Sequence, residues 1–144
     1  MNYKELLNQH DKEMNEFSEK YIYWIFGTNE SDIIHQMDEL GLSLDDLISI
    51  GNSGYIEKEN YDSFVQLQKR IKKEHKQYML NNVYEVVYYQ CWNLEMELSL
   101  SYTYNDLIYK VLDFSYAESK KHGLEIEKAL SDYRREFYEE DLSL

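Results

Sequence analysis

Apolar residues recur at helical spacing along most of the chain. Between residues 3 and 25 they stand three, four or seven positions apart, which places them on one stripe of a helix, with His10 at a gap. Residues 59–80 and 124–138 show the same period. The chain has no proline and only five glycines, so few positions interrupt a helix. The pattern predicts a mainly helical protein.

Capping residues mark the ends of a second predicted helix. It is expected to begin near residues 29–31, where the side chain of Asn29 or Ser31 can accept a hydrogen bond from a backbone amide of the first turn. It is expected to end at Gly41. Its inner face is expected to carry Ile33, Ile34, Met37 and Leu40. Residues 43–46 are expected to form another short helical turn.

Residues 47–58 combine two β-prone runs with a loop that has glycine at both ends. The loop is Gly51-Asn52-Ser53-Gly54, and its position between the two runs predicts a small β-hairpin. Because a two-stranded hairpin is only marginally stable alone, we expect it to pack on helices.

The most apolar segment covers residues 83–98. It is apolar or aromatic nearly all round and is predicted to form the central buried helix, although its valines and tyrosines leave a strand as the alternative. Cys91 and Trp92 are expected in the core, with Cys91 as a structural thiol. A further helix, capped by Thr103, is expected to run through Phe114 toward a stop at Gly123.

Together these elements indicate a mainly α (α+β) fold, a compact helical domain of about five to six helices with one small β-hairpin. A length of 144 residues suits one domain over 1–144, with 115–144 as a C-terminal helical extension. The single cysteine, the absence of a long apolar run and the lack of a signal-peptide core predict a cytoplasmic protein that does not bind membranes.

The net charge changes this picture most. The chain has 28 acidic and 15 basic residues, which give a net charge of −13. Such a field repels phosphate backbones and anionic lipids and attracts basic surfaces. Residues 28–62 hold nine acids and one base, Lys58. These acids are the candidate partner-binding surface: Glu30, Asp32, Asp38, Glu39, Asp45, Asp46, Glu57, Glu59 and Asp62. With fifteen tyrosines in the chain, carboxylates and rings together suggest a DNA mimic.

A basic island interrupts the acidic chain. It consists of Lys69, Arg70, Lys72, Lys73 and Lys76, with Glu74 as the only acid in residues 69–76. Two interpretations remain open: contact with nucleic acid, or pairing of these cations with acidic neighbours, which the overall charge favours.

Candidate catalytic groups lack a recognisable motif. The four histidines are far apart in the sequence, and Ser53 lacks the Gly-x-Ser-x-Gly pattern of a nucleophile turn. His35, Asp38 and Glu39 would share one helix face, so a metal-dependent module is an alternative, whereas a solvated polar face is the favoured interpretation. The sequence predicts no enzyme, no cofactor and no metal.

Three motifs carry a resemblance over residues 17–113: Tyr23-Trp24-Ile25-Phe26-Gly27, Met37-Asp38-Glu39-Leu40-Gly41-Leu42 and Ile50-Gly51-Asn52-Ser53-Gly54-Tyr55-Ile56. A weaker match runs from Tyr84-Glu85-Val86 to Asn93-Leu94-Glu95. The chain resembles a family of small uncharacterised acidic proteins of phages and mobile elements of Gram-positive and gut bacteria. It departs from that family at Asn52-Ser53, where more glycines are usual, and at Leu94, where histidine is common.

The resemblance implies a mobile-element setting, in which small acidic proteins inhibit host defences. The expected function is therefore an acidic protein-binding inhibitor in the bacterial host cytoplasm. It would block a nucleic-acid-handling defence protein such as a CRISPR-Cas effector (an anti-CRISPR) by occupying its basic groove. An alternative is a small structural or self-associating adaptor, a homodimer formed through the helix of residues 3–25.

Overall fold

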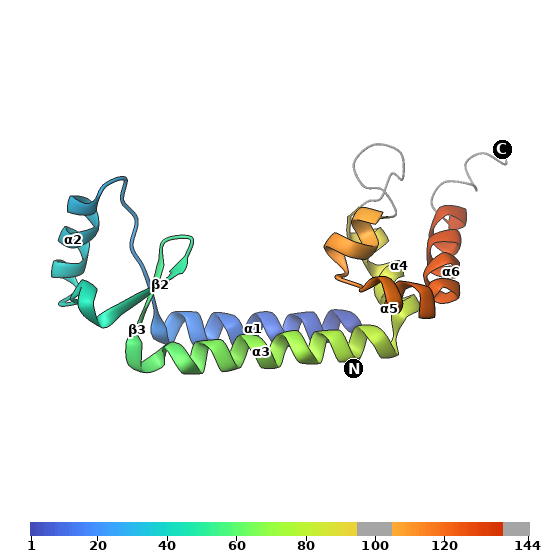
Figure 1. The fold of residues 1–144 in the computed structure, drawn as a ribbon, viewed down its shortest axis with the longest axis horizontal. Helices are drawn as coiled ribbons and strands as arrows, with labels where there is room; N and C mark the ends of the chain where they lie inside the picture. Colours follow the sequence, from blue (N-terminus) through green and yellow to red (C-terminus); the bar gives the residue numbers. More distant parts are fainter. Residues whose placement is uncertain (95–104, 137–144) are drawn as a thin grey trace. The chain divides into compact units, whose positions relative to one another are not determined.

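A computed structural model of the chain describes residues 1–94 and 105–136. Its elements are α1 (Tyr3–Tyr21), β1 (Ile22–Trp24), α2 (Glu30–Glu39), the 3-10 turn η1 (Leu44–Asp46), β2 (Leu47–Gly51), β3 (Gly54–Glu57), α3 (Lys58–Asn81), α4 (Val83–Asn93), the π-helical turn η2 (Asp106–Val111), α5 (Tyr116–Lys121) and α6 (Gly123–Arg134) (Figure 1). The predicted mainly α fold is confirmed, and the helices are accompanied by a small three-stranded antiparallel sheet. Among the described residues, no helix is long and apolar enough to cross a bilayer. The chain divides into two units, Met1–His75 and a second that begins at Lys76.

In the first unit, α1 lies side by side with the part of α3 up to His75 (Figure 1). The ring centroids of Phe17 and Phe64 are 5.9 Å apart, and the Tyr3 hydroxyl lies 2.7 Å from Nε2 of His75. His10, at the gap in the apolar stripe, is only 5% exposed. The stripe expected to pair with a second copy is therefore covered by the chain's own α3.

The predicted helix over residues 3–25 is wrong at its end, because α1 stops at Tyr21 and a strand follows. This strand, β1, pairs antiparallel with β3, with Ile22 opposite Ile56 and Trp24 opposite Gly54. The sheet order is β1-β3-β2, so the predicted hairpin of β2 and β3 gains a third strand. Consecutive β-branched and aromatic residues favour this pairing once β3 offers its free edge.

The hairpin turn is formed by Asn52 and Ser53, whose φ angles of 51° and 67° are both positive, as a type I′ turn requires. Gly54 does not have a positive φ angle, and glycine is needed there because a side chain would contact its neighbours too closely. A Cβ at this position would lie 3.1 Å from Cζ3 of Trp24 and 3.1 Å from Cγ1 of Ile50. The glycine thus allows β1 and its tryptophan to approach the turn.

Both predicted caps of α2 are confirmed. The Asn29 side chain accepts from the Asp32 amide at 2.9 Å, and Gly41 has a φ of 70°. Met37 joins Ile25 and Leu47 in a small buried cluster. The expected inner face is wrong for Ile34 and Leu40, which are exposed, because so small a cluster covers only one side of the helix.

In the second unit, α4 packs against α6, and the predicted helix is confirmed for residues 83–93. The buried residues are Val83, Val86, Val87 and Cys91 on α4, and Ile126, Ala129, Leu130 and Tyr133 on α6. The expectation that Trp92 is buried is wrong, since its side chain is 56% exposed. Spacings of three and four place the buried residues on one face of α4, and Trp92 falls on the other. Residues 95–98 of this prediction lie outside the described residues.

The expected helix from Thr103 to Gly123 is broken. Thr103 itself lies outside the described residues, η2 ends at Val111, and Asp113 adopts a φ of 54°. A new helix, α5, then begins after Ser115. The Ser115 hydroxyl accepts from the Glu118 amide at 3.1 Å, and the Glu118 carboxylate accepts from the Ser115 amide at 2.9 Å. This capping box fixes the start of α5. Gly123 opens α6, and of the predicted last helix 124–138 the structure shows residues 124–134.

Candidate protein-binding surface

All nine candidate acids lie in the first unit. They stand on α2 (Glu30, Asp32, Asp38 and Glu39), η1 (Asp45 and Asp46), β3 (Glu57) and the beginning of α3 (Glu59 and Asp62). Eight are exposed and Glu57 is half-buried. The turns at Gly41 and Asn52-Ser53 bring segments from different parts of the sequence around one small sheet. Carboxylates scattered over 33 positions therefore share the surface of a single unit.

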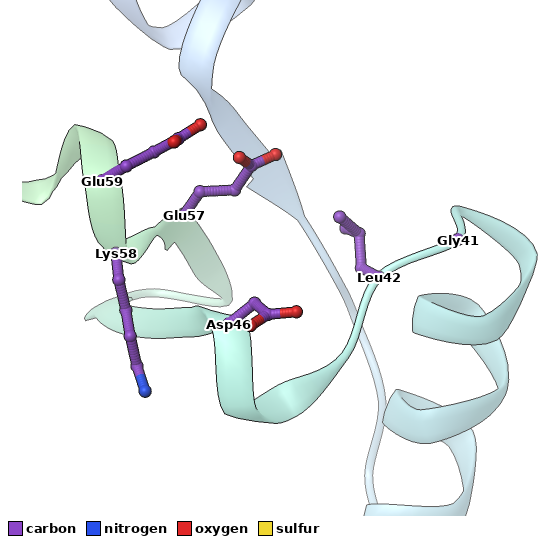
Figure 2. Close-up of a pocket in the computed structure, with 6 residues that line it drawn as sticks. All are labelled: Gly41, Leu42, Asp46, Glu57, Lys58 and Glu59. Atoms are coloured by element: carbon purple, nitrogen blue, oxygen red, sulfur yellow. The ribbon is translucent and has the colours of Figure 1, made fainter.

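Three of these nine acidic residues line a hollow of about 420 Å³. It is lined by Gly41, Leu42, Asp46, Glu57, Lys58 and Glu59. Figure 2 shows that Lys58, the only base of residues 28–62, directs its ammonium group away from the carboxylates of Glu57 and Glu59. The hollow is consequently an acidic depression with a lysine at its margin.

Few of the nine carboxylates are engaged within the protein. Glu39 Oε1 lies 3.1 Å from Nε2 of His35, and Glu57 accepts a hydrogen bond of 2.9 Å from the Tyr23 hydroxyl. That hydrogen bond raises the pKa of Tyr23. Within residues 1–94 and 105–136, the other seven and Lys58 form no ion pair. Their charge is left facing the solvent.

Two exposed aromatic side chains belong to the same unit as the acids, and the sequence alone does not identify them. Trp24 and Phe26 are 49% and 65% exposed, although Trp24 continues the apolar stripe of the predicted first helix. The Gln36 side chain of α2 holds this segment, because Phe26 N–H donates to its Oε1 at 3.2 Å and its amide donates to the Phe26 carbonyl. The signal available in the sequence was the β-prone run Ile22-Tyr23-Trp24-Ile25 before Gly27.

The pairing interpretation of the basic island is confirmed for two of its cations. Arg70 bridges Glu13 at 2.5 Å and Glu74 at 2.7 Å, and its guanidinium lowers the pKa of Glu13. In the second unit, Lys76 Nζ lies 2.8 Å from Oε1 of Glu118. This contact, helped by the Ser115 amide, lowers the pKa of Glu118 to about 2. The remaining members, Lys69, Lys72 and Lys73, are exposed.

The other candidate chemistry does not gather into a site. In the described part of the chain, no three His, Cys, Asp or Glu side chains are placed to hold a metal ion, and His35 contacts only Glu39 of its predicted set. Cys91 is fully buried, and burial raises the pKa of its thiol to about 11. The thiol therefore stays protonated and is a poor nucleophile at neutral pH.

Comparison with known proteins gives one match. A family model described as "Family of unknown function (DUF7659)" matches residues 2–135. No curated protein and no solved structure matches the chain. Since the match covers nearly the whole chain, this protein belongs to the DUF7659 family.

Proposed function

We propose that this protein binds a basic, nucleic-acid-handling protein of a bacterial host and inhibits it by occupying its nucleic-acid groove. The specific candidate is a CRISPR-Cas effector, so that the protein would act as an anti-CRISPR encoded by a phage or mobile element. The observation that supports this proposal is the set of solvent-facing carboxylates on α2, η1 and the start of α3, most of which have no cationic partner in the described residues.

Electrostatics explain why such a surface suits a basic groove. A groove lined by lysine and arginine attracts carboxylates as it attracts phosphates, and exposed carboxylates keep most of their long-range field. Steering of this kind can raise an association rate by about 10–10³ at low salt. Solvated carboxylates contribute little to folding, so their main effect is on encounter with a partner.

The exposed rings supply the short-range part of the interaction. Trp24 ends strand β1 and Phe26 follows it, and Gln36 of the acidic helix α2 holds the Phe26 backbone. Aromatic residues at the centre of an interface, surrounded by charged groups, often contribute most of its affinity. The proposed interface therefore combines anchoring rings with a carboxylate rim on the first unit.

Competition with nucleic acid tests this function. The immobilised protein is exposed to a bacterial host lysate, and bound proteins are eluted with an oligonucleotide; each eluted protein is then purified and assayed for nucleic-acid binding. The proposal expects a basic protein whose affinity for its own nucleic acid falls as the acidic protein is added. A partner that binds nucleic acid and the acidic protein together, with neither affinity changed, would contradict it.

Two charge-matched variants localise the effect. The first carries Asp38→Asn, Glu39→Gln, Asp45→Asn and Asp46→Asn. The control carries Asp11→Asn, Glu16→Gln, Glu19→Gln and Glu127→Gln, all exposed positions outside the acidic surface. Both remove four negative charges. Loss of competition in the first variant alone is expected, whereas equal loss in both would point to net charge in place of a defined surface.

A further inference from the structure

The exposed side of α4 in the second unit carries a second candidate binding surface, unrelated to the acidic one. Tyr84, Glu85, Tyr88, Tyr89 and Trp92 line a hollow of about 420 Å³. The ring centroids of Tyr84 and Tyr88 are 6.1 Å apart and those of Tyr89 and Trp92 are 6.4 Å apart. Because the opposite side of α4 packs on α6, these rings form an aromatic face on a fixed helix.

Carboxylates surround this aromatic face. The Tyr84 hydroxyl donates to Asp132 at 2.6 Å, and the Tyr88 hydroxyl donates to Glu136. Glu85 lines the hollow itself and accepts a hydrogen bond of 2.6 Å from the Tyr78 hydroxyl. The hydrogen bonds to Asp132 and Glu136 raise the pKa of Tyr84 and of Tyr88 to about 12, so both rings remain neutral phenols at physiological pH. A phenol that donates to a carboxylate gains electron density in its ring, which makes the ring face more attractive to a cation.

One cation of the protein already uses this face. The Lys128 ammonium lies 5.4 Å from the centroid of the Tyr84 ring, within the range of a cation–π contact. Tryptophan is the strongest of the aromatic partners for a cation, and Trp92 is 56% exposed. The same chemistry is therefore available to a cation brought by another molecule.

We propose that the aromatic face formed by Tyr84, Glu85, Tyr88, Tyr89 and Trp92 binds an arginine side chain in a basic segment of a protein partner. A guanidinium stacks on aromatic planes and forms hydrogen bonds with carboxylates. This face offers rings together with the carboxylates of Glu85 and Glu136, each of which accepts from a tyrosine through one oxygen. Exposed rings alone would also suit nucleic-acid bases, but the carboxylates of Glu85, Asp132 and Glu136 repel the phosphates that accompany them. The site stands on its own residues, whether or not the acidic surface binds a nucleic-acid-handling protein.

A pair of short peptides tests the site. One contains three arginines separated by glycines, and its control replaces each arginine with citrulline, which has nearly the same shape without the charge. The chain has two tryptophans, so a Trp24→Phe background leaves Trp92 as the only indole fluorophore. The arginine peptide is expected to change Trp92 fluorescence with saturation, and the citrulline peptide to bind far more weakly. Equal binding of the two peptides would overturn the proposal.

Substitutions separate this site from general attraction to a negative protein. Measured by calorimetry, Trp92→Ala should weaken arginine-peptide binding by roughly 2- to 30-fold, the range for one cation–π contact. Because the Trp92 side chain is exposed, the variant is expected to fold, and circular dichroism checks this directly. The amide variant at Asp38, Glu39, Asp45 and Asp46 should still show the fluorescence change. Unchanged affinity in Trp92→Ala, or loss of the Trp92 signal in the amide variant, would contradict the assignment.

Lys128 gives the sharpest comparison, because its ammonium competes for the Tyr84 ring. Lys128→Gln should tighten arginine-peptide binding more than Lys121→Gln, which removes the same charge from an exposed position on α5. The same change in both variants would mean that net charge alone governs binding, and the proposed site would be rejected.

Discussion

The carboxylates of residues 28–62 in the first unit and those of the second unit occupy different environments. Between Glu30 and Asp62 most face the solvent, and the closest described contacts are those of Glu39 with His35 and Glu57 with Tyr23. In the second unit, five described carboxylates each contact a lysine, an arginine or a tyrosine hydroxyl: Glu85 with Tyr78, Asp106 with Lys110, Glu118 with Lys76, Asp132 with Tyr84 and Arg135, and Glu136 with Tyr88.

This difference shows why a charge count does not identify a binding surface. Both units are rich in acids, yet a carboxylate that accepts hydrogen bonds inside its own unit contributes to local structure. A solvated carboxylate contributes little to stability and keeps its field for a partner. The number of acids can be counted from the sequence, but whether they are engaged depends on tertiary contacts.

The largest expected effect concerns the sheet that carries the acidic surface. Gly54→Ala would bring a Cβ to 3.1 Å from Trp24 and 3.3 Å from the Gly51 carbonyl. We expect the free energy of unfolding to fall by about 1–3 kcal/mol, as for other overpacked sites. Denaturant titration measures it. Gly123→Ala in the second unit is the control, because its Cβ would meet nothing within 4 Å, and a similar loss in both would refute the packing argument.

The next effect compares an engaged carboxylate with a solvated one. Glu118→Gln weakens the contact with Lys76 and the capping box with Ser115, so we expect a loss of about 1–2 kcal/mol in unfolding free energy. Asp45→Asn on η1 should change stability by no more than about 0.5 kcal/mol. Equal effects of the two substitutions would remove the distinction between the units.

The pH dependence of this difference gives a smaller but more specific effect. The pKa of Glu118 falls from 4.5 in its reference state to about 2 in the folded protein, chiefly through Lys76. The unfolded chain therefore binds the proton first, so the contribution of Glu118 is fully present above pH 4.5 and is lost as pH falls toward 2. The stability gap between wild type and Glu118→Gln should close over that window. A gap that stays constant would show that Glu118 acts through its shape and not its charge.

Local signals predicted much of the fold. Asn29 and Gly41 marked the ends of α2, and the glycines around Asn52-Ser53 marked the hairpin, because caps and tight turns depend on residues close in sequence. The start of α5 is equally local, since Ser115 and Glu118 have the spacing of a capping box.

The remaining differences between the predictions from the sequence and the structure depend on contacts between residues that are distant in the sequence. The run from Ile22 to Trp24 continues the helical stripe of α1 and becomes a strand because β3 offers a pairing edge. Trp92 belongs to an apolar segment, yet α6 covers only one face of α4. The candidate acids were identified from the sequence, whereas the exposed rings beside them depend on this tertiary arrangement.

The central claim is that solvated carboxylates of the first unit steer association with a basic partner. Its direct test is the association rate with the partner recovered by nucleic-acid elution, measured against ionic strength for three proteins. These are the wild type, the amide variant at Asp38, Glu39, Asp45 and Asp46, and the charge-matched control at Asp11, Glu16, Glu19 and Glu127. We expect the amide variant alone to associate about 10-fold more slowly or worse at low salt, with a flatter salt dependence. Equal rates and equal salt slopes for wild type and the amide variant would contradict the claim.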